Sequence, residues 1–268
     1  MRRVTARYRF VIWRAGGAPC TRFRAGSRRE CALRVKLRFA IHRSVVNILA
    51  LESSTELCSA ALWRDGRIDA READAGQRNS EVLLPMVEAL LAAQAVDRED
   101  LDGIAFGSGP GAFTGLRVAC GVAQGIAFGM NLPVAGVVTL RALAQAAQAP
   151  RVVCCLDARM GEIYHAAYEK DGDDWREVCM PGLCKPDAAP ALPGKGWSGC
   201  GSGFAAFRAA LEQRYAGALE RVIDGIVPHA RDVAALAARA FARGETVAAE
   251  LAAPLYVRNK VALRVDER

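Results

Sequence analysis

Residues 46–66, VNILALESSTELCSAALWRDG, set out the plan of the fold. The run VNILAL (46–51) is almost wholly apolar, which is typical of a β-strand covered on both faces, and it ends at the acid Glu52. After the polar turn SST comes LCSAALW (57–63), and the turn signal RDG (64–66) leads into another short polar strand. The stretch therefore predicts a strand, a hairpin and a third strand.

Residues 151–172, RVVCCLDARMGEIYHAAYEKDG, repeat this plan further along the chain. An apolar strand ends at Asp157, and a tight turn, a second strand and a DG turn follow. Glu52 and Asp65 are 13 positions apart, and Asp157 and Asp171 are 14 apart. Two generic hairpins could match by chance at this low identity, but duplication of a lobe is the better explanation. We therefore expect a first lobe over 46–149 and a second, reduced lobe over 150–268, whose C-terminal segment could pack back on the first.

The segments between and after the two copies complete an α/β fold. SEVLLPMVEALLAAQ (80–94) places apolar side chains on one broad helical stripe. GIAFG (103–107), FTGLRVACGVAQGIAFG (113–129) and PVAGVV (133–138) predict a strand, a helix and a strand, which is a βαβ unit with parallel pairing. Two later stretches have weaker patterns: a helix at VAALAARAFA (233–242) and a closing strand at PLYVRN (254–259).

The glycine-rich stretch GSGPGAFTGLR (107–117) lies between that strand and helix and admits two interpretations. Glycines at a helix N-terminus can present backbone N–H groups to a phosphate. The stretch lacks the Lys-Ser or Lys-Thr pair of a Walker A loop and the GxGxxG spacing. Alternatively, Gly109 and Gly111 adopt positive φ in a tight turn that Pro110 stiffens, while Thr114 helps to cap the helix. The residues alone favour neither interpretation.

Few side chains offer catalytic chemistry. Glu52 and Asp157 end equivalent strands and could hold a metal-nucleotide between the lobes, or they could simply cap their own turns. The nine cysteines form no CxxC pair and the three histidines lie far apart, so we expect no metal site, no cofactor and no catalytic residue. The candidates for weak nucleotide or phosphate contact are Glu52, Ser53, Gly107, Gly109, Gly111, Thr114 and Asp157.

Three glycines spaced four apart in the predicted helix 113–129 lie on one helical face. Each costs about 1 kcal/mol relative to alanine in a helix interior, so a compensating packing role is expected. Small residues on one face let two helices approach closely. We interpret this face as a packing surface, either inside the protein or against a partner. If it meets a partner, the predicted partner interface consists of Val82, Leu83, Met86, Val87, Leu90, Leu116, Gly121, Gly125 and Gly129.

The net charge of +7 is unevenly distributed along the chain. Residues 1–45 hold thirteen basic side chains and one acid, whereas the remaining residues carry a small acidic excess. This N-terminal extension is not expected to fold alone. It could be an RNA-contacting tail, an organelle transit segment or a stretch included through a misplaced start, which we favour. The uncharged run 118–140 is better explained by a helix and a strand than by a membrane span, and we expect a cytoplasmic protein.

Five motifs in order resemble the bacterial TsaB (YeaZ) family, over about residues 46–262. They are LALESSTELCSAALWRDG, SEVLLPMVEALL, GSGPGAFTGLRVACGVAQGIA, DARMGEIY and PLYVRN. The resemblance implies an actin-like ATPase (ASKHA) fold of two RNase H-like lobes with mixed sheets flanked by helices. It also implies a role in threonylcarbamoylation of adenosine 37 in tRNAs that read codons starting with A. The implied partners are the catalytic paralogue TsaD and the ATPase TsaE, with a homodimer when the chain is alone and tRNA contact only through the complex.

The resemblance also indicates which subunit performs the chemistry. In the catalytic paralogue, two metal-binding histidines four residues apart follow the strand that corresponds to PVAGVV, and here Thr139 and Leu143 align with them. A hydroxyl and an aliphatic side chain cannot replace two imidazoles on a transition metal. Glu52 stands where the family usually has Asp, and Asn79 where His is frequent. We therefore expect a non-catalytic subunit that binds and activates TsaD; the alternative is an ATP-dependent enzyme of the same fold.

Overall fold

The computed structural model describes residues 46–76 and 78–258, so the expectations for the extension 1–45 lie outside the described residues. The first sheet has the strand order β3-β2-β1-β4-β5. β1 pairs antiparallel with β2 and parallel with β4, so the sheet is mixed. The turn at Asp65 and Gly66 has positive φ at both residues, as a tight hairpin requires. The strands are β1 (Asn47–Glu52), β2 (Leu57–Arg64), β3 (Arg67–Asp74), β4 (Gly103–Gly109) and β5 (Val134–Val138).

The second sheet repeats the topology of the first. Its order is β10-β9-β6-β7-β8, in which β6 pairs antiparallel with β7 and parallel with β9. The duplicated strand and hairpin plan predicted from residues 151–172 is therefore confirmed at the level of topology. The strands are β6 (Arg151–Asp157), β7 (Ile163–Asp171), β8 (Asp174–Cys184), β9 (Trp197–Cys200) and β10 (Leu219–Ile223).

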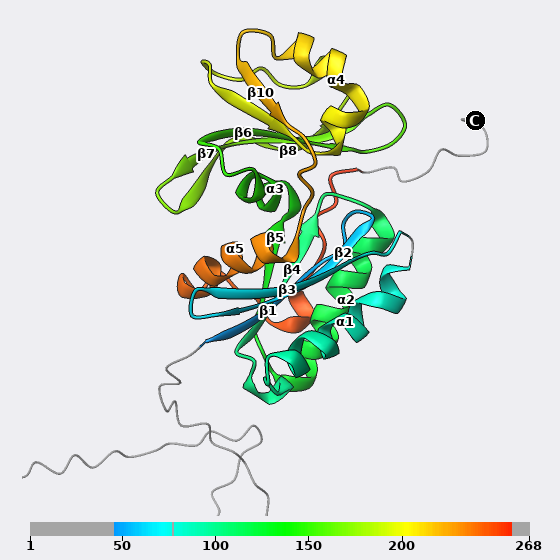
Figure 1. Cartoon of the computed structure of the whole chain (residues 1–268), viewed down its shortest axis with the longest axis vertical. Helices are drawn as coiled ribbons and strands as arrows, with labels where there is room; N and C mark the ends of the chain where they lie inside the picture. The colour runs from blue at the N-terminus through cyan, green and yellow to red at the C-terminus, as the bar shows by residue number, and fades with distance from the viewer. Residues whose placement is uncertain (1–45, 77, 259–268) are drawn as a thin grey trace, which may run out of the picture. The chain divides into compact units, whose positions relative to one another are not determined.

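Alternate residues of the central strands face different helical layers. In β1, Leu49 and Leu51 pack with α1 and α2 on one face, while Ile48 and Ala50 join α3 and α5 on the other. The second sheet shares the α3 and α5 layer through residues of β6 and covers its other face with α4. Figure 1 shows α5 on one side of the first sheet and α1 with α2 on the other. The helices are α1 (Asn79–Ala93), α2 (Phe113–Met130), α3 (Thr139–Ala147), α4 (Ser202–Arg214) and α5 (Ala230–Ala242).

The C-terminal residues differ from the prediction. Residues 254–258 form no strand, and Asn259 lies outside the described residues. Leu255 N donates to Ser108 O at 2.7 Å, but this bond is not extended into a ladder. Three short 3₁₀ turns complete the described elements: η1 (Arg98–Asp100), η2 (Pro186–Ala188) and η3 (Ala249–Leu251).

Helix α2 is long and apolar enough to cross a membrane by length and composition alone. In this fold its small side chains Ala119, Ala123 and Ala127 are fully buried against the first sheet. Of its glycines, Gly115 permits a close approach, because a Cβ there would lie 1.8 Å from Ser53 O. A Cβ at Gly121 would meet no atom within 4 Å.

We expect opposite effects from two alanine substitutions in α2. Gly115→Ala should lower the free energy of unfolding by about 1–3 kcal/mol because its methyl group clashes with backbone. Gly121→Ala should raise it by about 0.5–1 kcal/mol because alanine is the better helix former. Urea denaturation followed by circular dichroism measures both. Equal effects of the two substitutions would contradict the close contact at Gly115.

Candidate functional site

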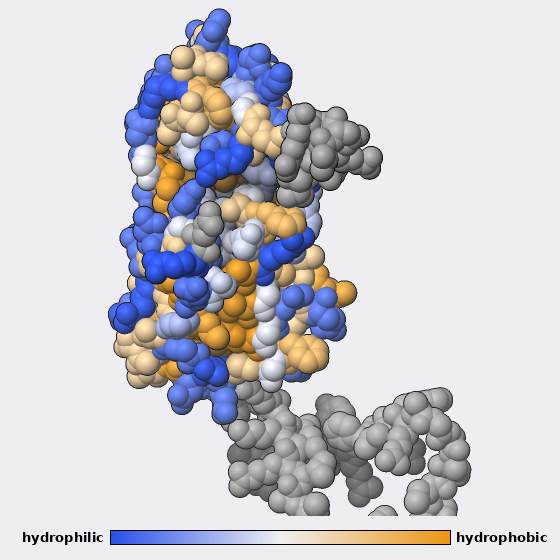
Figure 2. Space-filling view, turned by 90° about the vertical axis from the view of Figure 1, so that its right-hand side faces the viewer, coloured by the Kyte–Doolittle hydropathy of each residue, from blue (hydrophilic) through white to orange (hydrophobic). Residues whose placement is uncertain are grey.

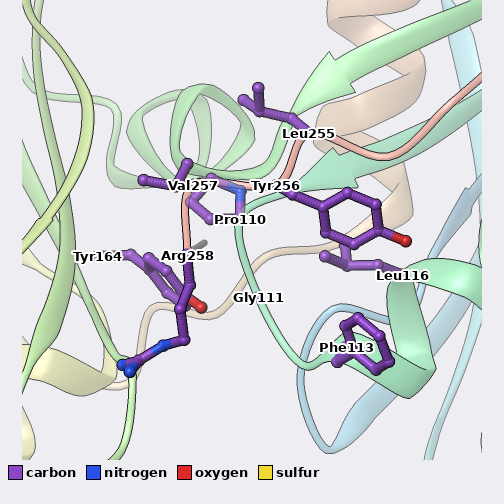
Figure 3. A pocket seen from close by; sticks show the side chains of 9 residues that line it. All are labelled: Pro110, Gly111, Phe113, Leu116, Tyr164, Leu255, Tyr256, Val257 and Arg258. Carbon is purple, nitrogen blue, oxygen red and sulfur yellow. The ribbon is translucent and has the colours of Figure 1, made fainter. Parts of the chain in front are cut away.

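Three strands of the two sheets end at a common crevice beside the C-terminal segment. The turn after β1 touches the glycine-rich loop, since Ala112 N donates to Ser54 O at 2.7 Å. The turn after β6 is bridged to the turn after β1 by an ion pair between Arg159 and Glu56 at 3.0 Å. Figure 3 shows the small pocket left at this crevice, with Arg258 of the C-terminal segment reaching toward the second sheet. The carboxyl ends of parallel strands are the usual ligand sites of such folds.

The glycine-rich loop turns several polar groups inward. Gly109 has φ of 114° and is followed by a cis peptide bond to Pro110. Its N–H donates to the buried hydroxyl of Thr139 at 3.1 Å, and the N–H of Ala112 is also taken. A phosphate cradle needs free N–H groups directed at the ligand. Two of the N–H groups that could form one are therefore already bonded within the protein.

Two expectations about this loop are corrected. Gly111 is not in the positive-φ region; glycine is needed there because a Cβ would lie 2.6 Å from the Cβ of Ser54. Thr114 does not cap α2: Ala112 occupies the N-cap position, and no side chain caps the helix. Ser53 lies against the first turn of α2, where its hydroxyl donates to Gly115 O at 2.9 Å.

Glu52 is fully buried against the loop. Its Oε1 accepts from Ser54 N at 2.6 Å, and its Oε2 accepts no hydrogen bond from the described residues. A Cβ at Gly107 would lie 1.8 Å from that Oε2, so the carboxyl group fills the space that this glycine leaves. Burial raises the pKa of Glu52, although hydrogen bonds from Ser54 and Ser53 act in the opposite direction.

Asp157 interacts within its own turn. Its Oδ1 accepts from Arg159 N at 2.8 Å, and its Oδ2 pairs with the Arg159 guanidinium at 3.2 Å. The N–H of Asp157 is also bonded within the protein, since it donates to the hydroxyl of Ser202 at 3.0 Å. These are the contacts of a turn-capping acid. The structure therefore gathers Glu52, Ser53, Gly107 and Gly111 at one loop and holds Asp157 in a separate turn.

The positions aligned with metal-binding histidines have packing roles here. Thr139 begins α3, and its hydroxyl supports the loop through Gly109. Leu143 is fully buried in the layer between the sheets. Among residues 46–76 and 78–258, no group of three His, Cys, Asp or Glu side chains is placed to hold a metal ion.

The predicted partner interface needs correction at five of its nine residues. All five side chains are buried, four of them on α1 in the core between this helix, the first sheet and α2, and one on α2 beside the crevice, so they are not available to a partner helix. The helical stripe of α1 therefore faces the protein's own sheet. The buried residues are Leu83, Met86, Val87, Leu90 and Leu116.

The other four predicted residues lie at or near the surface. Gly121, Gly125 and Gly129 are exposed, and a Cβ at any of them would meet no atom within 4 Å. Val82 is partly buried, as are Val118, Val122 and Ile126 of α2. Figure 2 shows this side of the molecule, where an apolar area lies beside a pale strip of intermediate hydropathy.

Sequence reasoning raised the possibility that the C-terminal segment packs back on the first lobe, but it did not identify the contacts of this segment in the crevice. Tyr256 accepts from Arg117 Nε at 3.0 Å, and the Arg117 guanidinium lies 3.4 Å from the ring centroid of Phe113. Leu255 bonds to the end of β4. The aromatic and basic residues of LYVR were visible in the sequence, but contacts made across more than a hundred positions leave no periodic pattern.

Replacing Glu52 should change how stability depends on pH. The raised pKa means that Glu52 costs no stability at low pH, and that stability is lost as the pH rises through the folded-state pKa. Glu52→Gln cannot ionise, so wild type should lose thermal stability relative to this variant as the pH rises above the ordinary glutamate pKa of about 4.5 and through the raised folded-state pKa. Calorimetric melting across this range measures the difference. Parallel curves for the two proteins would show that Glu52 is not desolvated.

Known proteins match most of the described chain. The family model described as TsaD, tRNA N6-adenosine threonylcarbamoyltransferase, matches residues 73–264. The tRNA threonylcarbamoyladenosine biosynthesis protein TsaB of Escherichia coli is 38% identical over 226 residues, which cover 81% of this chain and 96% of that protein. The protein of the same name from Haemophilus influenzae is 36% identical over 229 residues, covering 81% and 95%.

A solved structure agrees with these sequence matches. YeaZ from Pseudomonas aeruginosa superposes with a TM-score of 0.73 at 39% identity, and the match covers 79% of this chain and 99% of that one. The expected actin-like ATPase fold, with two mixed sheets flanked by helices, is confirmed. Because these relatives match along nearly their whole length, the chain belongs to the TsaB (YeaZ) family of tRNA threonylcarbamoyladenosine biosynthesis proteins.

Proposed function

We propose that this chain is the non-catalytic subunit that binds and activates a TsaD-type paralogue. The reaction is N6-threonylcarbamoylation of adenosine 37 in tRNAs that read ANN codons. Membership of the family supports a role in this pathway. The outer face of α1 and α2 is the surface on which a partner would dock. This surface is the observation that carries the proposal.

The outer face of α1 and α2 is suited to another helix. Gly121 and Gly125 are exposed on α2, with open space above them, and Pro85 and Ala89 are exposed on the outer side of α1. Small residues of this kind allow a partner helix to approach close to the backbone. Apolar side chains at the edges of the face, including Val82, would lose their remaining contact with water.

The crevice supports an accessory role rather than a transfer reaction. Thr139 and Leu143 are engaged in the loop and the core, where the paralogue would need metal ligands. Asp157 is paired with Arg159 in its own turn. Two N–H groups of the glycine-rich loop are bonded internally, which leaves it poorly prepared for a phosphate.

The proposal includes the wider assembly. A TsaE-type ATPase would join the complex of this chain with its TsaD-type paralogue, and the same helical face would support a homodimer when the paralogue is absent. Contact with tRNA would occur only through the complex, in the cytoplasm. The two lobes would occupy residues 46–149 and 150–268, with α5 of the second packed on the first sheet.

One observation favours a second function, an ATP-dependent enzyme of the same fold. The carboxyl group of Glu52 lies beside the glycine-rich loop with one oxygen that accepts no hydrogen bond from the described residues. An oxygen of this type can bind Mg²⁺. Its complete burial and raised pKa make it a poorer ligand than an exposed carboxylate, and we rank this function second.

Substitutions on the outer face should weaken assembly without unfolding the chain. Gly125→Leu and Ala89→Arg place bulk or charge where the partner would approach, and each should raise the dissociation constant by at least about tenfold. Ala206→Arg is the matched control, because Ala206 is an exposed alanine on α4. Analytical ultracentrifugation of each variant mixed with the paralogue measures assembly. Wild-type affinity for both face variants would place the interface elsewhere.

Reconstituted modification of tRNA tests the function itself. The paralogue, the TsaE-type ATPase, threonylcarbamoyl-adenylate and an ANN-decoding tRNA should give modified adenosine efficiently only when this chain is added. Chains starting at Met1 and at Val46 should serve equally well. Mass spectrometry of the digested tRNA quantifies the product. Full activity without the chain would contradict the proposal. Hydrolysis of ATP by the isolated chain in the presence of Mg²⁺ would favour the second function.

A further inference from the structure

The C-terminal segment 252–258 crosses the crevice and is attached at its start, in its middle and at its far end, and Tyr256 also bonds to Arg117 of α2. At its start, Ala252 O accepts from Gln124 Nε2 of α2 at 2.9 Å. In the middle, Leu255 N donates to Ser108 O at the end of β4. At its far end, Arg258 pairs with Glu162 at 2.7 Å and donates to Ala158 O at 3.0 Å. Figure 3 shows Leu255, Tyr256, Val257 and Arg258 lining the pocket opposite Pro110 and Gly111.

These attachments are polar contacts between residues far apart in the sequence. Ala252 and the Arg258 side chain are largely buried at the two ends of the segment, whereas its middle is more exposed. Leu255 and Tyr256 remain 38% and 46% exposed. The pocket beneath the segment, lined by Leu116 and Tyr164 among others, is not filled by it. A segment with few buried apolar contacts and no ladder of hydrogen bonds belongs to the low-stability end of a structure and opens without global unfolding.

The contacts of Ala252 and Tyr256 are made with α2, the helix that forms part of the outer face proposed to bind the partner. Gln124, which holds Ala252, immediately precedes Gly125, and Arg117, which holds Tyr256, lies four positions before Gly121. Phe113 and Arg117 are exposed at the same end of α2. A partner on this face would meet the exposed Phe113 and Arg117, against which Tyr256 packs with ring centroids 5.8 Å apart and an Arg117 hydrogen bond, and would compete with Tyr256 for that surface.

We propose that residues 252–258 form a detachable strap, which closes the crevice beside the glycine-rich loop and is released when a partner occupies the outer face of α2. Release would break the ion pair of Arg258 with Glu162 and so free the turn after β6. The link to a partner rests on the proposed function, whereas the detachment of the strap is a property of the isolated chain. Binding of a partner to α2, which packs on the first sheet, would thereby change the turn after β6 in the second sheet.

Two signals report on the strap. One is hydrogen exchange at the Leu255 amide. The other is alkylation of Cys120, a buried thiol whose Sγ lies 3.6 Å from Ala252 O. In the isolated chain we expect Leu255 to exchange faster than the amides of β1. Arg258→Ala and Gln124→Ala should each speed Leu255 exchange by about three- to tenfold, since each removes one attachment. Arg208→Ala, which removes a surface ion pair between α4 and Asp224, is the control and should leave both signals unchanged.

The outcomes separate the strap from the assembly. If Leu255 exchanges as slowly as β1, or if neither strap variant changes its rate, the segment is part of the core and the proposal is wrong. Mixing the chain with the paralogue should speed Leu255 exchange further, with complex formation checked independently by sedimentation. A complex that forms but slows Leu255 exchange would overturn partner-driven release. Failure to form any complex would instead count against the proposed function, while the isolated-chain result still decides whether the strap detaches.

Discussion

The contact of the β1 turn with the first turn of α2 determines most of the crevice. Ser53 O lies where a side chain at position 115 would begin, and the Ser53 hydroxyl donates to Gly115 O. Only glycine allows this backbone approach. With the turn and the helix in contact, Glu52 is pressed against Gly107, and Ala112 bonds to Ser54. The shape of the loop therefore follows from one missing Cβ more than from any ligand.

The sequence was a good guide to elements whose pattern is local. The paired hairpins, the βαβ unit and the helices near 80–94, 113–129 and 233–242 all occur, because apolar period and turn residues act within a few positions. The partner stripe on α1 was misplaced for a physical reason: periodicity shows that Leu83 and Leu90 share a face, but not whether that face meets the protein's own sheet or another molecule. The cap at Thr114 failed because α2 begins at Phe113, which places Thr114 inside the first turn and Ala112 at the N-cap position.

The candidate site was the least predictable part of the molecule. The sequence places Glu52 at the end of a strand, but its burial against Gly107 is revealed only by the fold. The engagement of Gly109 with Thr139 joins residues 30 positions apart. The strap was mistaken for a strand because PLYVRN has the composition of one, while a single bond to Ser108 is all the pairing it makes.

The exposed glycines of α2 would also affect how fast the chain is degraded in the cell. Glycine at each of the three positions weakens the helix by roughly 1 kcal/mol relative to alanine, with no compensating contact inside the protein. Binding that covers these positions would stabilise the folded chain in proportion to partner concentration. An orphan copy would open more often and be degraded sooner. The glycine face would thus match the amount of this subunit to the amount of its partner, through turnover and without any regulation of synthesis.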